Sequence, residues 1–222
     1  MKFTKGYWMN LPGVTNTDAV QVREVKVEND RVYLYTVPYH ADMRAMGGPL
    51  LEMYISSPQP DIIRTEAYHF MGSNQKMPAF ELNDAHCALE VENTETTVTI
   101  KSGNTKLVIG KNPCSFDYYY KDKKGCGRQV RKDVIEELTS IGNRFGNAMI
   151  STISTPDGNY MRAQMNLDIG EKVYGLGERF TPYVKNGQTV ETWNEDGGTC
   201  TEISYKSIPF YITNRNYGVL VN

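Results

Sequence analysis

The segment LEVENTETTVTIKSGNTKLVIGKNPCSFDYYY, residues 89–120, decides the fold class. Apolar residues alternate with polar ones in three short runs, and the polar or glycine-containing residues 93–95 and 102–104 separate these runs. A period of two is typical of strands that bury one face, and turns at this spacing join neighbouring strands as hairpins. The segment therefore predicts an antiparallel meander.

Strand-like patterns continue on the N-terminal side of this meander. Residues 20–27 and 32–37, which flank a polar turn, predict a hairpin. Residues 50–56 and 62–70 predict two further strands, because the prolines between them interrupt pairing. The chain is thus rich in short strands.

Residues 160–169 show the most regular alternation in the sequence. They predict a strand with Met161, Met165 and Leu167 buried and with polar residues such as Arg162 and Gln164 in water. A helix is predicted only at residues 133–141, whose apolar residues share one face at helical spacing before Gly142. Together these patterns predict an all-β chain: a two-sheet antiparallel β-sandwich with at most one or two short helices.

Composition and charge exclude several classes of protein. The formal net charge of −2 over 222 residues gives no electrostatic reason to expect nucleic acid or an anionic membrane as a partner. No apolar run is long enough to span a membrane, and residues 1–13 lack the apolar core of a signal peptide, so we expect a cytoplasmic protein. The four cysteines form no C-x-x-C pair, and His86 beside Cys87 has no further ligand at short spacing. We therefore predict no metal site and no cofactor.

Residues 173–221 carry the motifs that suggest chemistry. GLGERF, residues 175–180, is a glycine-containing turn after an apolar strand, and WNEDGG, residues 193–198, is a polar loop with one aromatic ring. An apolar ring face beside hydroxyl-binding oxygens is the usual chemistry of a sugar contact, which draws attention to Trp193 and Asp196. The same residue types also build turns that bind nothing. A hairpin region without a ligand is therefore the alternative.

These motifs resemble the N-terminal domain of family 31 glycoside hydrolases, the α-glucosidases and α-xylosidases. Three further stretches extend the resemblance: NGQTVETWN at 186–194, IPFY at 208–211 and YGVLVN at 217–222. Within the family, the sequence is most similar to the bacterial α-xylosidases. The resemblance implies a galactose-mutarotase-like supersandwich that occupies residues 1–222 as a single N-terminal domain. It also implies that a catalytic (β/α)₈ barrel follows in the parent enzyme.

The resemblance also indicates what this chain lacks. A retaining glycosidase needs two carboxylates, and in the family both are barrel aspartates, with the nucleophile in a W-x-D-M-N-type motif that is absent here. We therefore expect no catalytic residue in this chain. The chain is expected to be an inactive fragment of an enzyme that hydrolyses terminal α-linked xylose or glucose. Its expected partners are its own C-terminal barrel and, through the parent, the carbohydrate; the oligomeric state stays open.

The same resemblance implies roles for individual residues. The domain is expected to brace the barrel and to supply one loop of the substrate pocket, in which Asp196 matches the family's sugar-binding aspartate. Trp193 either stacks on the sugar or anchors the loop, and Glu195 is given no role. A structural role in the turn, including a pairing of its two charged residues, is expected for Gly175, Gly177, Glu178 and Arg179.

Two other functions fit the same fold class. A stand-alone carbohydrate-binding module would need an aromatic platform on one sheet face. An aldose epimerase would need an acid/base set, typically with His and Glu. The three histidines all precede residue 87 and are far in sequence from residues 173–221, so the epimerase ranks last.

Overall fold

The computed structural model describes residues 3–5, 9–38, 50–69, 85–120, 136–141, 150–195, 204 and 206–221, and within them it contains strands and no helix. The all-β prediction is therefore confirmed. Every pairing between these strands is antiparallel. The strands are β1 (Thr4–Lys5), β2 (Met9–Asn10), β3 (Thr15–Asp18), β4 (Gln21–Val27), β5 (Arg31–Val37), β6 (Leu51–Ser56), β7 (Arg64–Tyr68), β8 (Glu90–Asn93), β9 (Thr97–Ser102), β10 (Thr105–Lys111), β11 (Cys114–Tyr120), β12 (Glu136–Ile141), β13 (Ile150–Thr155), β14 (Gly158–Ala163), β15 (Val173–Gly175), β16 (Phe210–Thr213) and β17 (Gly218–Leu220).

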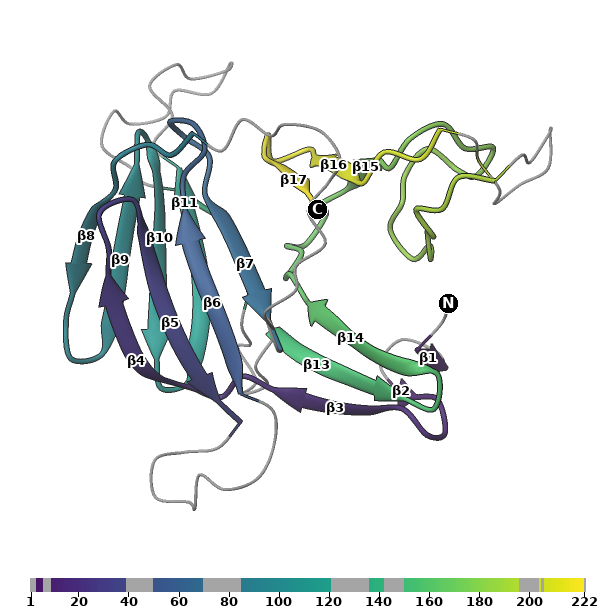
Figure 1. Cartoon of the computed structure of the whole chain (residues 1–222). Coiled ribbons are helices and arrows are strands. Elements are labelled where there is room, and N and C mark those ends of the chain that lie inside the picture. Colours follow the sequence, from purple (N-terminus) through teal and green to yellow (C-terminus); the bar gives the residue numbers. More distant parts are fainter. Residues whose placement is uncertain are drawn as a thin grey trace. The chain divides into compact units, whose positions relative to one another are not determined.

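The strands belong to two compact units. The larger unit, Pro12–Asn166, contains a five-stranded sheet in the order β12-β11-β10-β9-β8, a four-stranded sheet β4-β5-β6-β7 and a three-stranded sheet β14-β13-β3 (Figure 1). The smaller unit, Met1–Leu11 with Leu167–Asn222, contains the pair β1-β2 and the sheet β15-β16-β17. The single domain expected over residues 1–222 stays a prediction.

One apolar core lies between the four-stranded and the five-stranded sheets. Strands β5, β6, β9, β10 and β11 contribute alternate residues, as the period of two requires. Burying such a side chain stabilises the fold by about 1.5–3 kcal/mol. Nine of the core side chains are at most 1% exposed: Val32, Leu34, Met53, Ile55, Val98, Ile100, Leu107, Ile109 and Phe116.

The meander predicted from residues 89–120 is confirmed. Strands β8 to β11 pair in sequence order, and a two-residue turn at Gly103 and Asn104 joins β9 to β10. Gly103 has φ +59°, and the side-chain carboxylate of Asp61 accepts a hydrogen bond from the backbone of Asn104. The hairpin predicted at residues 20–37 is also present as β4 and β5.

The strand predicted at residues 160–169 is wrong in both extent and orientation. β14 ends at Ala163, opposite Ile150, where its partner β13 begins, so the ladder between these two strands stops there and residues 164–169 do not continue the strand. Met161 is 39% exposed and Leu167 is 46% exposed, whereas Met165 packs against the core. Alternation shows that two faces differ, but contacts in the folded chain decide which face is buried.

The helix predicted at residues 133–141 is also wrong for the part that the structure describes. Residues Glu136–Ile141 form β12, which pairs with β11 and completes the five-stranded sheet. Residues 133–135 lie outside the described residues. The open edge of β11 provides a full row of hydrogen-bond partners, and such tertiary pairing overrides a weak helical pattern.

Candidate functional site

The GLGERF turn leaves β15 through three successive residues with positive φ: Gly175 at +114°, Leu176 at +69° and Gly177 at +88°. A Cβ on Gly175 would lie 2.7 Å from Phe210 O, and a Cβ on Gly177 would collide with Lys206 O. Both glycines are needed because backbone approaches backbone at these points. Leu176 has a Cβ, so positive φ is unfavourable for it. Its conformation costs about 1–3 kcal/mol, which the surrounding contacts must offset.

The Arg179 side chain is the polar centre of this turn. Its Nε donates to Leu176 O at 3.1 Å, and one terminal nitrogen, Nη2, donates to Glu191 O at 2.6 Å and to Ser207 Oγ at 2.8 Å. A guanidinium offers five donors in a fixed plane, so it can hold several acceptors at once. The half-buried Arg179 thereby joins three segments that are separate in the sequence.

Glu178 contacts the segment that follows the candidate loop. Its carboxylate lies 3.4 Å from Lys206 Nζ in an exposed ion pair, and its backbone carbonyl accepts a 2.5 Å hydrogen bond from Ser204 Oγ. Its backbone N–H donates to Lys206 O at 3.0 Å. Glu178 and Arg179 thus each have partners in the 204–207 segment. Their predicted pairing with each other stays a prediction.

Trp193 lies at a shallow hollow on the smaller unit. The hollow has a volume of about 340 Å³ and is lined by Thr192, Trp193, Asn194, Ser207 and Pro209. The Trp193 side chain is 72% exposed. An exposed indole beside polar side chains has the chemistry of a sugar-stacking surface.

The residues around the hollow are fixed by hydrogen bonds between its two sides. Ser207 N donates to Asn194 Oδ1 at 2.8 Å, and Ser207 Oγ donates to Trp193 O at 3.2 Å. Glu195 N donates to Ser204 O at 2.9 Å. Sequence reasoning missed Ser204 and Ser207, because isolated serines in the sequence carry no signal of the backbone groups they will meet.

The predicted site residues are therefore partly placed. Trp193 lines the hollow, and Arg179 donates to Ser207, which lines it too. Glu178 O accepts from Ser204 Oγ. Gly175 and Gly177 lie against the backbone of Phe210 and Lys206. Asp196, the predicted sugar ligand, lies outside the described residues. The exposed Glu195, which had no predicted role, lies at the end of the described part of this segment.

Residues 185–188, KNGQ, form hydrogen bonds with the first residue of β15. Val173 N donates to Asn186 Oδ1 at 2.9 Å, and Lys185 N donates to Val173 O at 2.8 Å. The Lys185 ammonium is buried and donates to Thr181 Oγ1 at 3.0 Å and Pro182 O at 2.9 Å. Burial and the charge of Arg179 lower the pKa of this amine. Neutral acceptors around a buried lysine are typical of a structural role.

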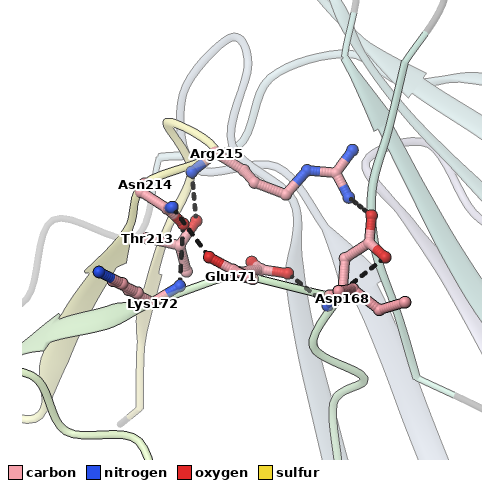
Figure 2. Close-up of polar contacts among 8 residues, drawn as sticks. Asp168, Glu171, Lys172, Thr213, Asn214 and Arg215 are labelled. Carbon is pink, nitrogen blue, oxygen red and sulfur yellow. Dashed lines mark hydrogen bonds and ion pairs between the residues drawn. The ribbon is translucent and has the colours of Figure 1, made fainter.

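A second polar cluster connects the β16–β17 turn to the start of β15 (Figure 2). Arg215 donates to Asp168 Oδ2 at 2.9 Å, and Asn214 bridges Lys172 N at 2.9 Å and Gly170 O at 3.2 Å. Glu171 is 5% exposed and accepts from Asp168 N at 2.8 Å. Burial and the nearby Glu171 raise the pKa of Tyr211 to about 12. These contacts fix the base of the β15–β17 sheet.

Neither a metal cluster nor a spanning helix occurs in the part of the chain that the structure describes. No group of three or more His, Cys, Asp and Glu side chains there could hold a metal ion. No helix there is long and apolar enough to cross a membrane. The described cysteines, Cys87 and Cys114, are free thiols.

The chain belongs to the glycosyl hydrolase 31 N-terminal galactose mutarotase-like domain family, which matches residues 52–222. This match confirms the family resemblance and the galactose-mutarotase-like fold that the sequence predicts.

Two curated relatives are α-xylosidases. The α-xylosidase XylQ of Lactiplantibacillus pentosus is 33% identical over 227 residues, and an α-xylosidase of Emericella nidulans is 33% identical over 231 residues. Each match covers 100% of this chain but only 27% and 29% of the respective relative. The chain thus spans little more than a quarter of the length of these enzymes.

A solved structure shares the fold. The cycloalternan-forming enzyme from Listeria monocytogenes, in complex with a pentasaccharide substrate, superposes with a TM-score of 0.69 at 20% identity. The match covers 96% of this chain and 18% of that enzyme. At this identity the likeness concerns the fold alone.

Proposed function

We propose that this chain is the non-catalytic N-terminal part of a retaining α-glycosidase that hydrolyses terminal α-linked xylose or glucose. The observation that carries the proposal is the match, along the whole chain, to two α-xylosidases that are more than three times as long. The two carboxylates that retaining hydrolysis requires then belong to the remaining part of the parent enzyme.

The chain's own contribution to the reaction is one wall of the sugar pocket. Trp193 offers an exposed ring face at the hollow, and Asp196 follows it by three residues. An ionised carboxylate accepts charge-assisted hydrogen bonds from two sugar hydroxyls. Asp196 therefore binds the sugar near the scissile bond, and the two neighbouring glycines allow close backbone approach.

The smaller unit also has an apolar sheet face suited to packing against another domain. Phe210 and Ile212 alternate along β16, and Leu220 pairs with Phe210 across the sheet, so the three side chains share one face. They are 41%, 48% and 65% exposed, respectively. Large apolar side chains grouped on one face mark an interaction surface. In the parent enzyme the catalytic barrel covers this face.

A stand-alone carbohydrate-binding module fits the structure less well. The outer face of the four-stranded sheet carries Tyr33, Tyr54 and Tyr68, but neighbouring rings are inclined by 55° and 71°. Arg31 lies 4.8 Å from the Tyr54 ring centroid, and Lys26 lies 5.2 Å from that of Tyr33. Cations already occupy these ring faces, which a sugar would need for flat stacking.

The test compares the isolated chain with the parent enzyme on an aryl α-xyloside and an aryl α-glucoside. The parent is expected to release the aryl group from one or both, and the chain from neither. Turnover by the chain above a heat-denatured sample would contradict the proposal, and mutarotation of a free aldose by the chain would favour the epimerase. Cell fractionation of the parent tests the proposed cytoplasmic location.

A further inference from the structure

The side chain of Asn194 is held in one orientation at the hollow. Ser207 N donates to Asn194 Oδ1 at 2.8 Å. A backbone N–H needs an acceptor, so this bond fixes which end of the amide is the oxygen and which is the nitrogen. In the part of the chain that the structure describes, no residue accepts a hydrogen bond from Asn194 Nδ2. Two oriented N–H donors are therefore left for a ligand.

Ser207 also fixes the backbone beside the hollow. Its Oγ donates to Trp193 O at 3.2 Å and accepts from Arg179 Nη2 at 2.8 Å. This half-buried serine thus holds the consecutive residues Trp193 and Asn194, and the guanidinium holds the serine. A ligand that binds here meets groups that are already in place, so ordering them costs little of the binding free energy.

The hollow fits a neutral sugar in both chemistry and size. The exposed indole of Trp193 offers an apolar face, and the Asn194 amide and the Thr192 hydroxyl can donate to oxygen. A volume of about 340 Å³ is near the lower end for a ligand pocket and suits a single pyranose ring. The lining residues would offer a phosphate or carboxylate group no counter-charge, since all five are uncharged: Thr192, Trp193, Asn194, Ser207 and Pro209.

We propose that Asn194 is a sugar-contacting residue: its Nδ2 group donates to a hydroxyl oxygen of a neutral pyranose that stacks on Trp193. This inference rests on the proposed function, in which the hollow belongs to the sugar pocket. Because Asn194 acts as a donor, the hollow selects a ring that carries a hydroxyl at the contacted position over a ring that carries only hydrogen there.

The test measures inhibition constants in the parent enzyme, with an aryl glycoside as the substrate. The inhibitors are the methyl α-glycoside of the sugar that the enzyme cleaves, its monodeoxy analogues and the matching deoxyfluoro analogues. Fluorine accepts a hydrogen bond but cannot donate one. At the hydroxyl that Asn194 contacts, the deoxy analogue is expected to bind about 5- to 30-fold more weakly than the unmodified glycoside. The deoxyfluoro analogue is expected to bind about 2- to 5-fold more tightly than the deoxy analogue.

The Asn194→Asp variant identifies the donor. It keeps an oxygen for Ser207 N but has no side-chain N–H, so the preference for fluorine over hydrogen is expected to disappear. The sugar hydroxyl can still donate to the new carboxylate, so the ratio between the analogues reports the contact, and the affinity of the unmodified glycoside does not. The matched control, Asn216→Asp, adds the same charge at an exposed residue between β16 and β17 and is expected to keep the preference. A preference for fluorine that persists in Asn194→Asp would overturn the proposal.

Two further readouts separate the contact from the fold and from the proposed function. The Ser207 amide is expected to exchange hydrogen at an unchanged rate in Asn194→Asp, because its acceptor oxygen remains. Faster exchange, together with equally weaker binding of every analogue, would show that Asn194 only supports the hollow and would overturn the proposal.

The series with the unchanged protein tests the proposal should Asn194→Asp not fold. If no position shows a preference for fluorine over hydrogen, the contact fails. A parent enzyme that cleaves neither aryl glycoside would contradict the proposed function instead. The contact is then tested by titrating Trp193 fluorescence in the isolated chain with the same analogues, in a Trp8→Phe background. The same order of affinities would support the contact, and no saturable change would overturn it.

Discussion

The hydroxyl oxygens of Thr65 on β7 and Tyr118 on β11 lie 3.1 Å apart, so one hydrogen bond joins the edge of the four-stranded sheet to the five-stranded sheet across the core. Burial raises the pKa of Tyr118, which keeps the phenol neutral and hydrogen-bonded at physiological pH. A second buried contact between the two sheets joins the hydroxyls of Ser57 and Ser102, which lie 2.6 Å apart.

Removing one partner of this bond is expected to destabilise the larger unit. Tyr118→Phe leaves the Thr65 hydroxyl without its partner and is expected to lower the free energy of unfolding by about 1–3 kcal/mol. The double variant with Thr65→Val replaces both groups and is expected to recover part of this loss. Urea unfolding followed by circular dichroism measures both. A double variant less stable than the sum of the single changes would contradict this account.

Gly177 is expected to tolerate no side chain. Gly177→Ala places a Cβ against Lys206 O and 2.8 Å from Ile208 N at φ +88°, so we expect a loss of about 2 kcal/mol or more in local stability. Gly187→Ala is the matched control, since Gly187 has φ +75° but no atom within 4 Å of a Cβ. It is expected to lose only about 1 kcal/mol.

Trp193 fluorescence measures the local stability of the Gly177→Ala and Gly187→Ala variants. Because the chain has two tryptophans, the measurement is made in a Trp8→Phe background. A shift of the Trp193 unfolding midpoint to lower urea is expected for Gly177→Ala and a smaller shift for Gly187→Ala. Equal shifts would show that backbone conformation, not the close approach to Lys206 and Ile208, requires glycine at position 177.

Cys114 is expected to resist alkylation in the folded protein. It is 5% exposed, and burial raises the pKa of its thiol from 9.0 to about 12. Because the folded-state pKa is the higher one, the neutral thiol stabilises the fold fully below about pH 9, and this contribution is lost as the pH rises to about 12. Cys114→Ala is expected to flatten the decline of stability across this pH range.

Iodoacetamide labelling at pH 8 followed by mass spectrometry checks the first part of this prediction. The half-buried Cys87 serves as the internal comparison and is expected to react faster than Cys114. Labelling of Cys114 at the rate of Cys87 in the folded protein would show that the core around β11 opens readily.

The apolar face of the β15–β17 sheet is expected to make the isolated chain self-associate. Leu220 is 65% exposed on this face, so Leu220→Lys should reduce light scattering and dye binding at high protein concentration. The matched change Leu167→Lys alters an exposed leucine outside this sheet and should do less. A wild-type chain that stays monomeric and binds no hydrophobic dye would count against a covered face.

Sequence patterns predicted the parts of the fold whose information is local. Alternation and turn residues at 89–120 specify a meander because each strand pairs with the next. The same reasoning failed at residues 160–169, since the partner β13 ends the pairing at Ala163 and the packing of the folded chain selects the buried face. It failed at residues 136–141 because their conformation is decided by pairing with the free edge of β11, and a local pattern does not contain that information.

The candidate site shows the same division. The glycines at 175 and 177 were identifiable because glycine marks positive φ or close approach, and both occur here. The partners of Arg179 were not identifiable, since Leu176 O and Glu191 O are backbone groups and Ser207 is an ordinary serine 28 residues away. Which backbone carbonyl a guanidinium meets depends on the tertiary fold alone.

The measurement that tests the central claim most directly is the kcat/KM of the parent enzyme with Asp196→Ala, beside Glu195→Ala as the control. Losing charge-assisted hydrogen bonds to the sugar is expected to lower kcat/KM by about 10- to 200-fold while leaving the fold and the barrel chemistry intact. Glu195→Ala is expected to change it far less. Equal effects of the two alanine variants would contradict the account and leave residues 193–198 as a turn without a ligand.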